Sequence, residues 1–499
     1  MKKYLILLLA LGALVSCENE IELEPISDIP GTGFLDNESA AKLAHTGLYS
    51  SLRGYNFSLF LLGEVRSDYY GGTTLESPNS IQLINQVINT TNVPFGNWGG
   101  FYTLVHRIND FLANVPDIEF SNEEEKQHLL GQVYGLRAYV YYTMLKTWGA
   151  VPISTEPFDT TADVADLNRA RSPKEEVMAL IKSDLENSLS AFGADDSFYK
   201  GKKIYWSKAA TLTLKGDVFI WSGKVLNGGN ADYTEAKSAL EQVTGTGVAL
   251  VPNFMDLWSP TNENNEEFIF TLSYERDQAG NFYNGVFTGR STEINQTWDS
   301  EGNSLANEIF NGGNRYGPSL KLLLKLDDTL DTRYNTLTRM FSDDAGHIPF
   351  DETNYVGSIL NKFLGIVDAG SRISVNDVPL YRHADALLLL AEAKNNLGED
   401  PSAEMNLVRQ RAFGANYDAA IHAFVNGSQE DNTLAILDER MKEFVGEGKR
   451  WWDLRRAGGT IIFDEVETLL ESEAFKLQLP ISPDMIGRNP LLEQTEGYE

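Results

Sequence analysis

The sequence of 499 residues is poor in the residues that usually build metal and catalytic centres. It holds one cysteine, Cys17, and six histidines. A single thiol excludes an intrachain disulfide, so the core must hold the fold by itself. The histidines are scattered without metal-ligand spacing, and the HExxH, CxxC, GxSxG and phosphate-loop patterns are absent. We therefore predict a protein that is not an enzyme and has no cofactor; a structural Ca²⁺ would need loop Asp and Asn ligands, and no pattern points to one.

Basic residues are scarce relative to acidic ones. The chain has 41 Lys and Arg against 71 Asp and Glu, a net charge of −30. Neutralising nucleic-acid phosphates requires clustered Lys and Arg, so the composition predicts that the protein has no nucleic-acid partner. Highly anionic ligands are disfavoured as well, unless a local basic pocket outweighs the net charge.

Long apolar runs are missing except at the start of the chain. After Lys2 and Lys3, residues 4–15 read YLILLLALGALV. This run is shorter than the roughly 20 residues that span a bilayer, and a basic start followed by a short apolar core is typical of a secretory signal. The sequence LVSC at 14–17 resembles the bacterial lipobox. We predict a signal peptide over 1–16 and a lipid on Cys17 that anchors the protein in the membrane; the alternative is an ordinary signal peptide with a chance cysteine.

Residues 17–30 form an acidic segment after the predicted lipid. Glu18, Glu20, Glu22 and Glu24 alternate along it. The minimal interpretation is a solvated spacer between lipid and fold. In Bacteroidetes-type bacteria, acid just after the lipidated cysteine resembles a signal for the outer cell surface. The predicted location is therefore the cell outer membrane, lipid-anchored and surface-exposed.

From residue 31 onward the pattern is mostly helical. Leu129, Val133, Leu136, Val140 and Met144 recur at spacings of four, three, four and four, which is one apolar face of a helix. Further helices are predicted over residues 101–115, 172–189, 207–225, 384–397, 401–413 and 434–445. Small residues within these segments favour close helix pairs. We predict a mostly α fold of about four tetratricopeptide-like helical hairpins.

The second half contains material of a different kind. Residues 250–376 are rich in Gly, Asn, Asp, Thr and aromatics, and within them 267–272 (EFIFTL) reads as a strand. Residues 277–304 show no lasting period, which is typical of functional loops. We predict a long irregular, loop-rich insert. Residues 31–499 are then a single domain with an N-terminal half at 31–250 and a C-terminal half at 251–499.

Four segments resemble motifs of the SusD/RagB family of outer-membrane lipoproteins. In order along the chain they are RAYVYY with WGAVP at 137–152, YRHADALLLLAEA at 381–393, ER with GEGKRWWDLRR at 439–456, and NPLLEQTEGY at 489–498. One departure, FVG at 444–446, affects packing only. The resemblance implies a tetratricopeptide-like fold with an irregular second half. It also implies a partner, a SusC-like TonB-dependent transporter that such lipoproteins cover as a lid.

The usual role of the family's members implies a function for this protein. We predict a glycan-binding lipoprotein that captures nutrient at the cell surface for import. The first alternative is a peptide-binding, RagB-like lid on the same type of transporter. A surface hydrolase and a purely structural lid are two further alternatives.

The family motifs themselves are predicted to build the fold. Arg450, Trp451, Trp452 and Asp453 look like a site, yet Trp and Arg commonly stack at helix junctions, where Asp–Arg pairs orient them. Arg382 and Asp385, three residues apart, receive the same interpretation. The ligand must therefore be sought in the loops.

Sugar rings lie with their C–H faces on aromatic rings, while their hydroxyls bind short polar side chains. Two loop regions combine such residues. The candidate ligand-binding residues are Asp68, Tyr69, Tyr70, Asn97 and Trp98 in the first region, and Tyr274, Tyr283 and Trp298 in the second. Each has a structural alternative: Trp98 could cap a helix, Asp68 could pair with Arg66, and Tyr283 could contact the transporter.

Overall fold

A computed structural model describes residues 35–71, 81–158, 163–310, 312–313 and 315–498. The signal peptide, Cys17 and the acidic spacer lie outside these residues and stay predictions. Within the described part, none of the helices combines the length and apolarity needed to cross a membrane.

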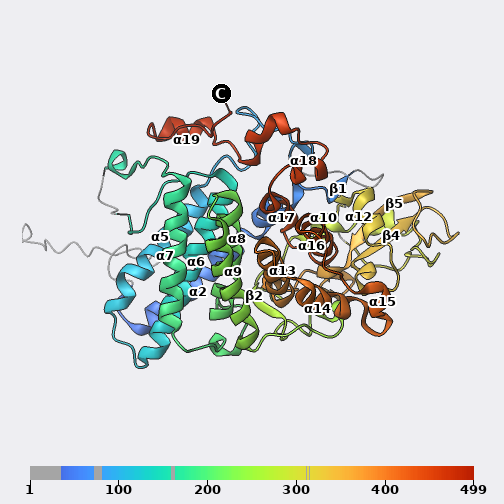
Figure 1. Ribbon diagram of the computed structural model, residues 1–499, viewed down its shortest axis with the longest axis horizontal. Helices are drawn as coiled ribbons and strands as arrows, with labels where there is room; N and C mark the ends of the chain where they lie inside the picture. Colours follow the sequence, from blue (N-terminus) through green and yellow to red (C-terminus); the bar gives the residue numbers. More distant parts are fainter. Residues whose placement is uncertain (1–34, 72–80, 159–162, 311, 314, 499) are drawn as a thin grey trace, which may run out of the picture.

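The first half is a stack of antiparallel helices, drawn from blue to green in Figure 1. Neighbours in the chain pack against each other, with α6 against α7 and α8 against α9 forming the most extensive pairs. The mostly α, tetratricopeptide-like prediction is confirmed. The helices are α2 (Glu38–Arg53), α3 (Asn56–Phe60), the π-helix η1 (Leu61–Val65), α4 (Ile81–Ile84), α5 (Gly99–Asn114), α6 (Glu123–Trp148), α7 (Lys174–Phe192), α8 (Lys208–Val225) and α9 (Gly229–Val243).

Helix α6 shows how the sequence sets the ends of a helix. Asn122 caps its start, accepting the Glu124 N–H at 2.9 Å, and three glutamates follow at the positive end of the helix dipole. At its other end the free carbonyls find partners from distant segments. The Arg455 guanidinium donates to the Lys146 carbonyl, and Arg171 donates to the Trp148 carbonyl at 2.6 Å. Arg171 and Arg455 form no ion pair with a carboxylate among the described residues, and the negative end of this helix explains their positions.

Within the described residues, the second half carries every strand except β1, together with the helices of the second and third family motifs, at the right and top of Figure 1. Helix α13 packs against α8 and α9, which joins the two halves. The helices are α10 (Tyr283–Phe287), α11 (Ser291–Ile294), α12 (Leu320–Lys325), α13 (His383–Asn396), α14 (Ser402–Phe413), α15 (Ala419–His422), α16 (Gln429–Glu443), α17 (Arg450–Ala457), α18 (Ile461–Glu465) and α19 (Pro483–Arg488).

In the part of the chain that the structure describes, the strands form four antiparallel pairs. These are β1 (Tyr70–Gly71) with β3 (Gly317–Pro318), β2 (Phe268–Leu272) with β8 (Val378–Arg382), β4 (Leu337–Phe341) with β5 (Tyr355–Leu360), and β6 (Ile366–Asp368) with β7 (Ser371–Ile373). The predicted strand at 267–272 is thus present. The segment at 250–376 is more regular than predicted: it contains short helices and two local hairpins, β4–β5 and β6–β7, while β2 and β3 pair with strands far along the chain.

One helix boundary and one residue pair also differ from the sequence-based expectation. Helix α16 begins at Gln429, ahead of the predicted 434, because the Ser428 hydroxyl accepts the Asp431 N–H and caps it there. Arg382 and Asp385 do not pair with each other. Arg382 precedes α13 in extended conformation and binds glutamates, whereas Asp385 binds Arg440 at 2.9 Å.

A buried network of ion pairs holds the second half together. Glu443 stands at its centre, with its side chain fully buried. Its carboxylate binds Arg382 at 2.6 Å, Arg333 at 3.2 Å, and Arg411. Five cations and five anions make the network neutral: Arg333, Lys362, Arg382, Arg409 and Arg411 with Glu267, Asp331, Glu439, Glu443 and Glu447. Burial alone would raise the pKa of Glu443, but the three arginines hold it well below its usual value.

Candidate functional site

Five of the six predicted aromatic ligand contacts are core residues. Tyr69, Tyr70, Trp98, Tyr274 and Tyr283 are between 0 and 6 % exposed. Their polar atoms are used internally: for example, the Tyr69 hydroxyl donates to the Met441 carbonyl at 2.9 Å. A ring buried on both faces cannot carry a sugar, so the structure corrects the predicted role of these five residues to one in packing.

The polar candidates near them have structural partners too. The Asp68 carboxylate binds Arg450 and Lys321, each at 2.8 Å, instead of Arg66. Arg66 lies over the Trp451 ring at 4.1 Å and donates to Gln86. Asn97 is exposed, and its side chain accepts the Gly99 N–H at 2.7 Å at the start of α5. Asp68 therefore serves to hold α17, while Asn97 remains accessible to a ligand.

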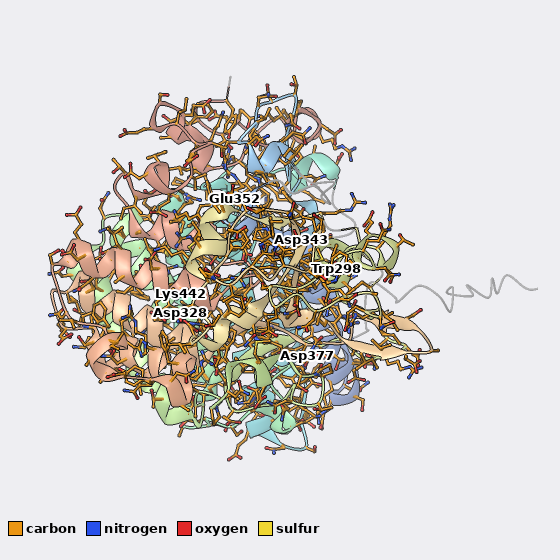
Figure 2. The ribbon with its side chains drawn as sticks, turned by 90° about the vertical axis from the view of Figure 1, so that its right-hand side faces the viewer. Trp298, Asp328, Asp343, Glu352, Asp377 and Lys442 are labelled. Carbon is orange, nitrogen blue, oxygen red and sulfur yellow. The ribbon has the colours of Figure 1, made fainter. Side chains whose placement is uncertain are left out.

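Trp298 is the one tryptophan of the chain's eight that reaches the surface. The other seven, all of them in the described residues, are at most 9 % exposed. Trp298 opens a turn over residues 298–304, on a face of the molecule that also carries Asp343 and Glu352 (Figure 2). Its backbone pairs with Phe341 at the end of β4, through N–H···O bonds of 3.0 and 2.9 Å. A partly exposed indole on a backbone-anchored turn beside carboxylates is the arrangement that suits a sugar ring.

The turn is rigid by its own hydrogen bonds. The Asp299 carboxylate accepts the N–H groups of Glu301 and Asn303 at 2.9 and 2.8 Å. Gly302 lies so close to the loop that follows β4 that a Cβ there would stand 2.6 Å from the Asp344 carbonyl oxygen. Trp298 is therefore presented by two interlocking loops.

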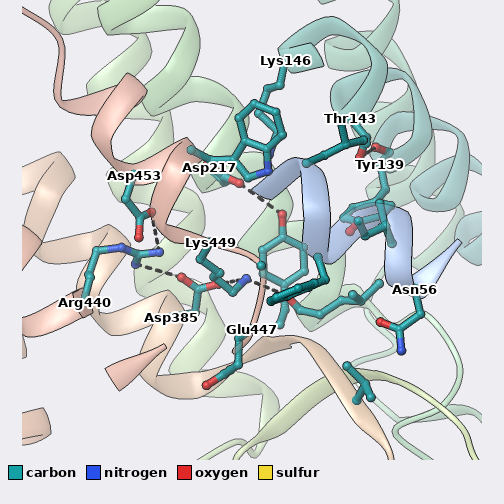
Figure 3. A pocket seen from close by; sticks show the side chains of 18 of the residues that line it. Asn56, Tyr139, Thr143, Lys146, Asp217, Asp385, Arg440, Glu447, Lys449 and Asp453 are labelled. Atoms are coloured by element: carbon teal, nitrogen blue, oxygen red, sulfur yellow. Dashed lines mark hydrogen bonds and ion pairs between the residues drawn. The ribbon is translucent and has the colours of Figure 1, made fainter. Parts of the chain in front are cut away.

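An internal polar cavity lies where α6, α8, α13 and α17 meet (Figure 3). In it Asp385 lies between Arg440 at 2.9 Å and Lys449 at 2.6 Å. Lys146 lies over the rings of Tyr142 and Trp452, and burial lowers its pKa to about 8. The cavity volume is about 50 Å³, which accommodates water but falls well below the roughly 300 Å³ of small ligand sites. We therefore assign this cavity a structural role and exclude it as the ligand-binding site.

Two larger hollows on the surface lack aromatic walls, whereas a third, of about 270 Å³, includes Phe158 in its lining. One of the two, of about 640 Å³, lies along α2 and α5 and includes Leu43. The other, of about 510 Å³, lies between Arg171 and the C-terminal segment around Gln494. Neither is lined by Trp, Tyr or Phe, so neither offers a stacking surface.

A neighbouring pair of carboxylates, Glu263 and Asp377, has pKa values suited to proton transfer, which bears on the hydrolase alternative. Burial and the neighbouring Asp377 raise the pKa of Glu263 to about 7, and burial raises that of Asp377 to about 6. The Asp377 carboxylate accepts the Tyr274 N–H at 2.8 Å, and neither residue lines the cavity or the hollows above. Burial also raises the pKa of Glu64 to about 7, but that carboxyl group is held inside the fold by the Tyr70 hydroxyl and two backbone N–H groups. Among the described residues, no group of three or more His, Cys, Asp or Glu is placed to hold a metal ion.

Comparison with known proteins covers nearly the whole chain. A model of the SusD family matches residues 228–498, and a model described as "Starch-binding associating with outer membrane" matches residues 22–214. The solved structure of B. fragilis NanU is 34 % identical with a TM-score of 0.86, over 96 % of this chain and all of that one.

Two curated relatives extend the comparison. A SusD-like protein of Formosa agariphila is 27 % identical over 99 % of this chain and 98 % of its own length. The starch-binding protein SusD of Bacteroides thetaiotaomicron is 21 % identical over 80 % of this chain and 78 % of its own length.

Proposed function

Because the chain belongs to the SusD family, we propose that it is a non-catalytic glycan-binding lipoprotein that captures polysaccharide or oligosaccharide at the outer cell surface. The observation that carries the proposal is Trp298, the partly exposed tryptophan on an anchored turn. The description of the N-terminal family model and the name of the Bacteroides relative support a glycan as ligand. Trp298 and the accessible Asn97 are the members of the predicted set that remain candidates for contact.

The membrane side of the proposal rests on the sequence. Removal of residues 1–16 and lipidation of Cys17 anchor the protein, and the acidic segment after Cys17 directs it to the surface. The captured glycan passes to a SusC-like TonB-dependent transporter for import. A pull-down of the transporter with the lipidated protein, lost after Cys17→Ala, tests anchoring and partnership together.

We predict that Trp298→Ala weakens binding of a polysaccharide that the wild-type protein binds by about tenfold or more, or roughly 1.4 kcal/mol. The reason is the loss of the stacking face, so Trp298→Phe should keep part of the affinity. The soluble form, residues 25–499, is run in affinity electrophoresis against a panel of neutral and acidic polysaccharides, and hits are titrated calorimetrically.

Phe475→Ala serves as the matched control, because Phe475 is 36 % exposed on the C-terminal segment and should leave binding unchanged. Equal binding by wild type and Trp298→Ala would remove Trp298 from the site. Heat from mixed peptides with none from glycans would replace the proposal by the peptide-binding lid, and turnover of a polysaccharide would replace it by a hydrolase.

A further inference from the structure

His347 lies in the loop that follows β4, next to the Trp298 turn. It is 6 % exposed, and both of its ring nitrogens face carboxylates: Nε2 is 2.9 Å from Asp343 and Nδ1 is 3.3 Å from Asp351. A neutral imidazole has one N–H and can donate to one of these carboxylates only, whereas an imidazolium donates to both. The geometry is therefore that of a charged histidine joining the two ends of the 342–354 loop.

The same residue is joined to Trp298 through the backbone. The His347 ring stacks on Phe341 with 4.0 Å between ring centroids and 12° between planes. Phe341 makes both backbone bonds to Trp298, and the His347 N–H donates to the Ser300 carbonyl at 2.8 Å. Any displacement of His347 thus acts directly on the turn that presents the indole.

The charged residues of the 342–354 loop and of the facing 298–304 turn are, apart from His347 itself, all acidic. Besides Asp343 and Asp351, the facing turn carries Asp299 and Glu301, and the loop itself carries the exposed Asp344 and Glu352. Among the described residues, none of these six carboxylates forms an ion pair with Lys or Arg. Although burial opposes it, the hydrogen bonds to Asp343 and Asp351 raise the pKa of His347 above its usual 6.5.

We propose that His347 is a positioning residue for the Trp298 surface: as an imidazolium it ties Asp343 to Asp351, and loss of its proton loosens the loop and the attached turn. The proposal rests on the proposed function for its effect on glycan binding. The sign follows from the geometry. A histidine charged in the folded state contributes fully at low pH, and its contribution is lost as the pH rises through the pKa of the folded protein. Glycan binding should therefore weaken above neutral pH.

The loop is tested without any ligand by ¹⁹F NMR of protein labelled with 5-fluorotryptophan, where Trp298→Phe assigns the Trp298 resonance. We expect this resonance to shift with pH, with a midpoint above 6.5, and to become independent of pH in His347→Gln. Asp343→Asn with Asp351→Asn should move the midpoint down. His422→Gln is the matched control, because His422 stacks on Phe413 in the same geometry, 3.9 Å and 12°, in α15. It should leave the Trp298 titration unchanged.

A Trp298 resonance that is insensitive to pH between 5.5 and 9, or that titrates equally in His347→Gln, overturns the proposal. The second measurement is binding of each polysaccharide that retards the wild type. Wild-type affinity should fall roughly fivefold or more from pH 6 to pH 9, while His347→Gln should bind weakly at both. A normal titration with no effect of Trp298→Ala on binding would refute the glycan site and leave the loop standing. Loss of binding in Trp298→Ala, together with a Trp298 resonance that does not titrate, would support the glycan site and refute the role of His347.

Discussion

Replacing Glu443 by Gln is expected to lower the free energy of unfolding by about 3–5 kcal/mol, the usual result of breaking a buried ion pair on one side. The Glu443 carboxylate binds Arg333, Arg382 and Arg411 and is fully buried. Glutamine keeps the shape but removes the charge, and its amide N–H groups would face guanidinium N–H groups. The network would then hold five cations against four anions, most of them buried, where water screens charge poorly.

Urea denaturation at pH 7 measures the effect, and Glu430→Gln is the matched control. Glu430 lies exposed in the first turn of the same helix, so its replacement should change stability by no more than about 0.5 kcal/mol. The dependence of stability on pH in the acid range gives a second measurement. Because the pKa of Glu443 is lowered in the fold, its contribution is present above the unfolded value of 4.5 and is lost as the pH falls below it. An unchanged urea midpoint for Glu443→Gln would show that the network contributes little.

The sequence motifs predicted this structural role but not its partners. The Arg, Trp and Asp residues of 450–453 were predicted to build the fold, and all four are buried. Which residue each one binds could not be predicted, because the partners come from remote segments. Arg450 binds Asp68 across 382 positions, and no helical spacing encodes such a pair. The helices, by contrast, could be predicted from local patterns, because caps and apolar periodicity act within a few residues.

The candidate site was harder to predict because a loop sequence does not show what covers the loop. Tyr69 and Tyr70 stand beside paired glycines, as binding-loop residues often do, yet both rings are packed in the core. Their hydroxyls found internal acceptors, which a sequence cannot reveal. Trp298 differed only in having polar neighbours on both sides, Asn295, Gln296 and Asp299. For His347 the sequence contains one weak indication of its role: Asp343 stands four residues before it and Asp351 four residues after it.

Gly63→Ala is expected to cost about 3 kcal/mol or more, whereas Gly47→Ala should stabilise the protein by about 0.5–1 kcal/mol. Both glycines lie in helical segments of the first half. A Cβ at Gly63 would stand 1.8 Å from the Gly448 carbonyl oxygen, while nothing lies within 4 Å of one at Gly47. The difference in sign therefore isolates the close approach from helix propensity.

The added methyl group would disrupt a contact between the two halves of the chain. Next to Gly63, the Glu64 carboxylate accepts the N–H groups of Gly446 and Gly448 at 2.8 and 2.6 Å, and the Tyr70 hydroxyl at 2.5 Å. Pushing the segments apart would leave a fully buried carboxylate without these donors. Urea midpoints of the two variants measure the effect, and equal midpoints would contradict it. Because Glu64 and Gly448 are 384 positions apart, a stability loss at Gly63 would show that the irregular turn of the third family motif, at 439–456, is fixed by the π-helix of the first half.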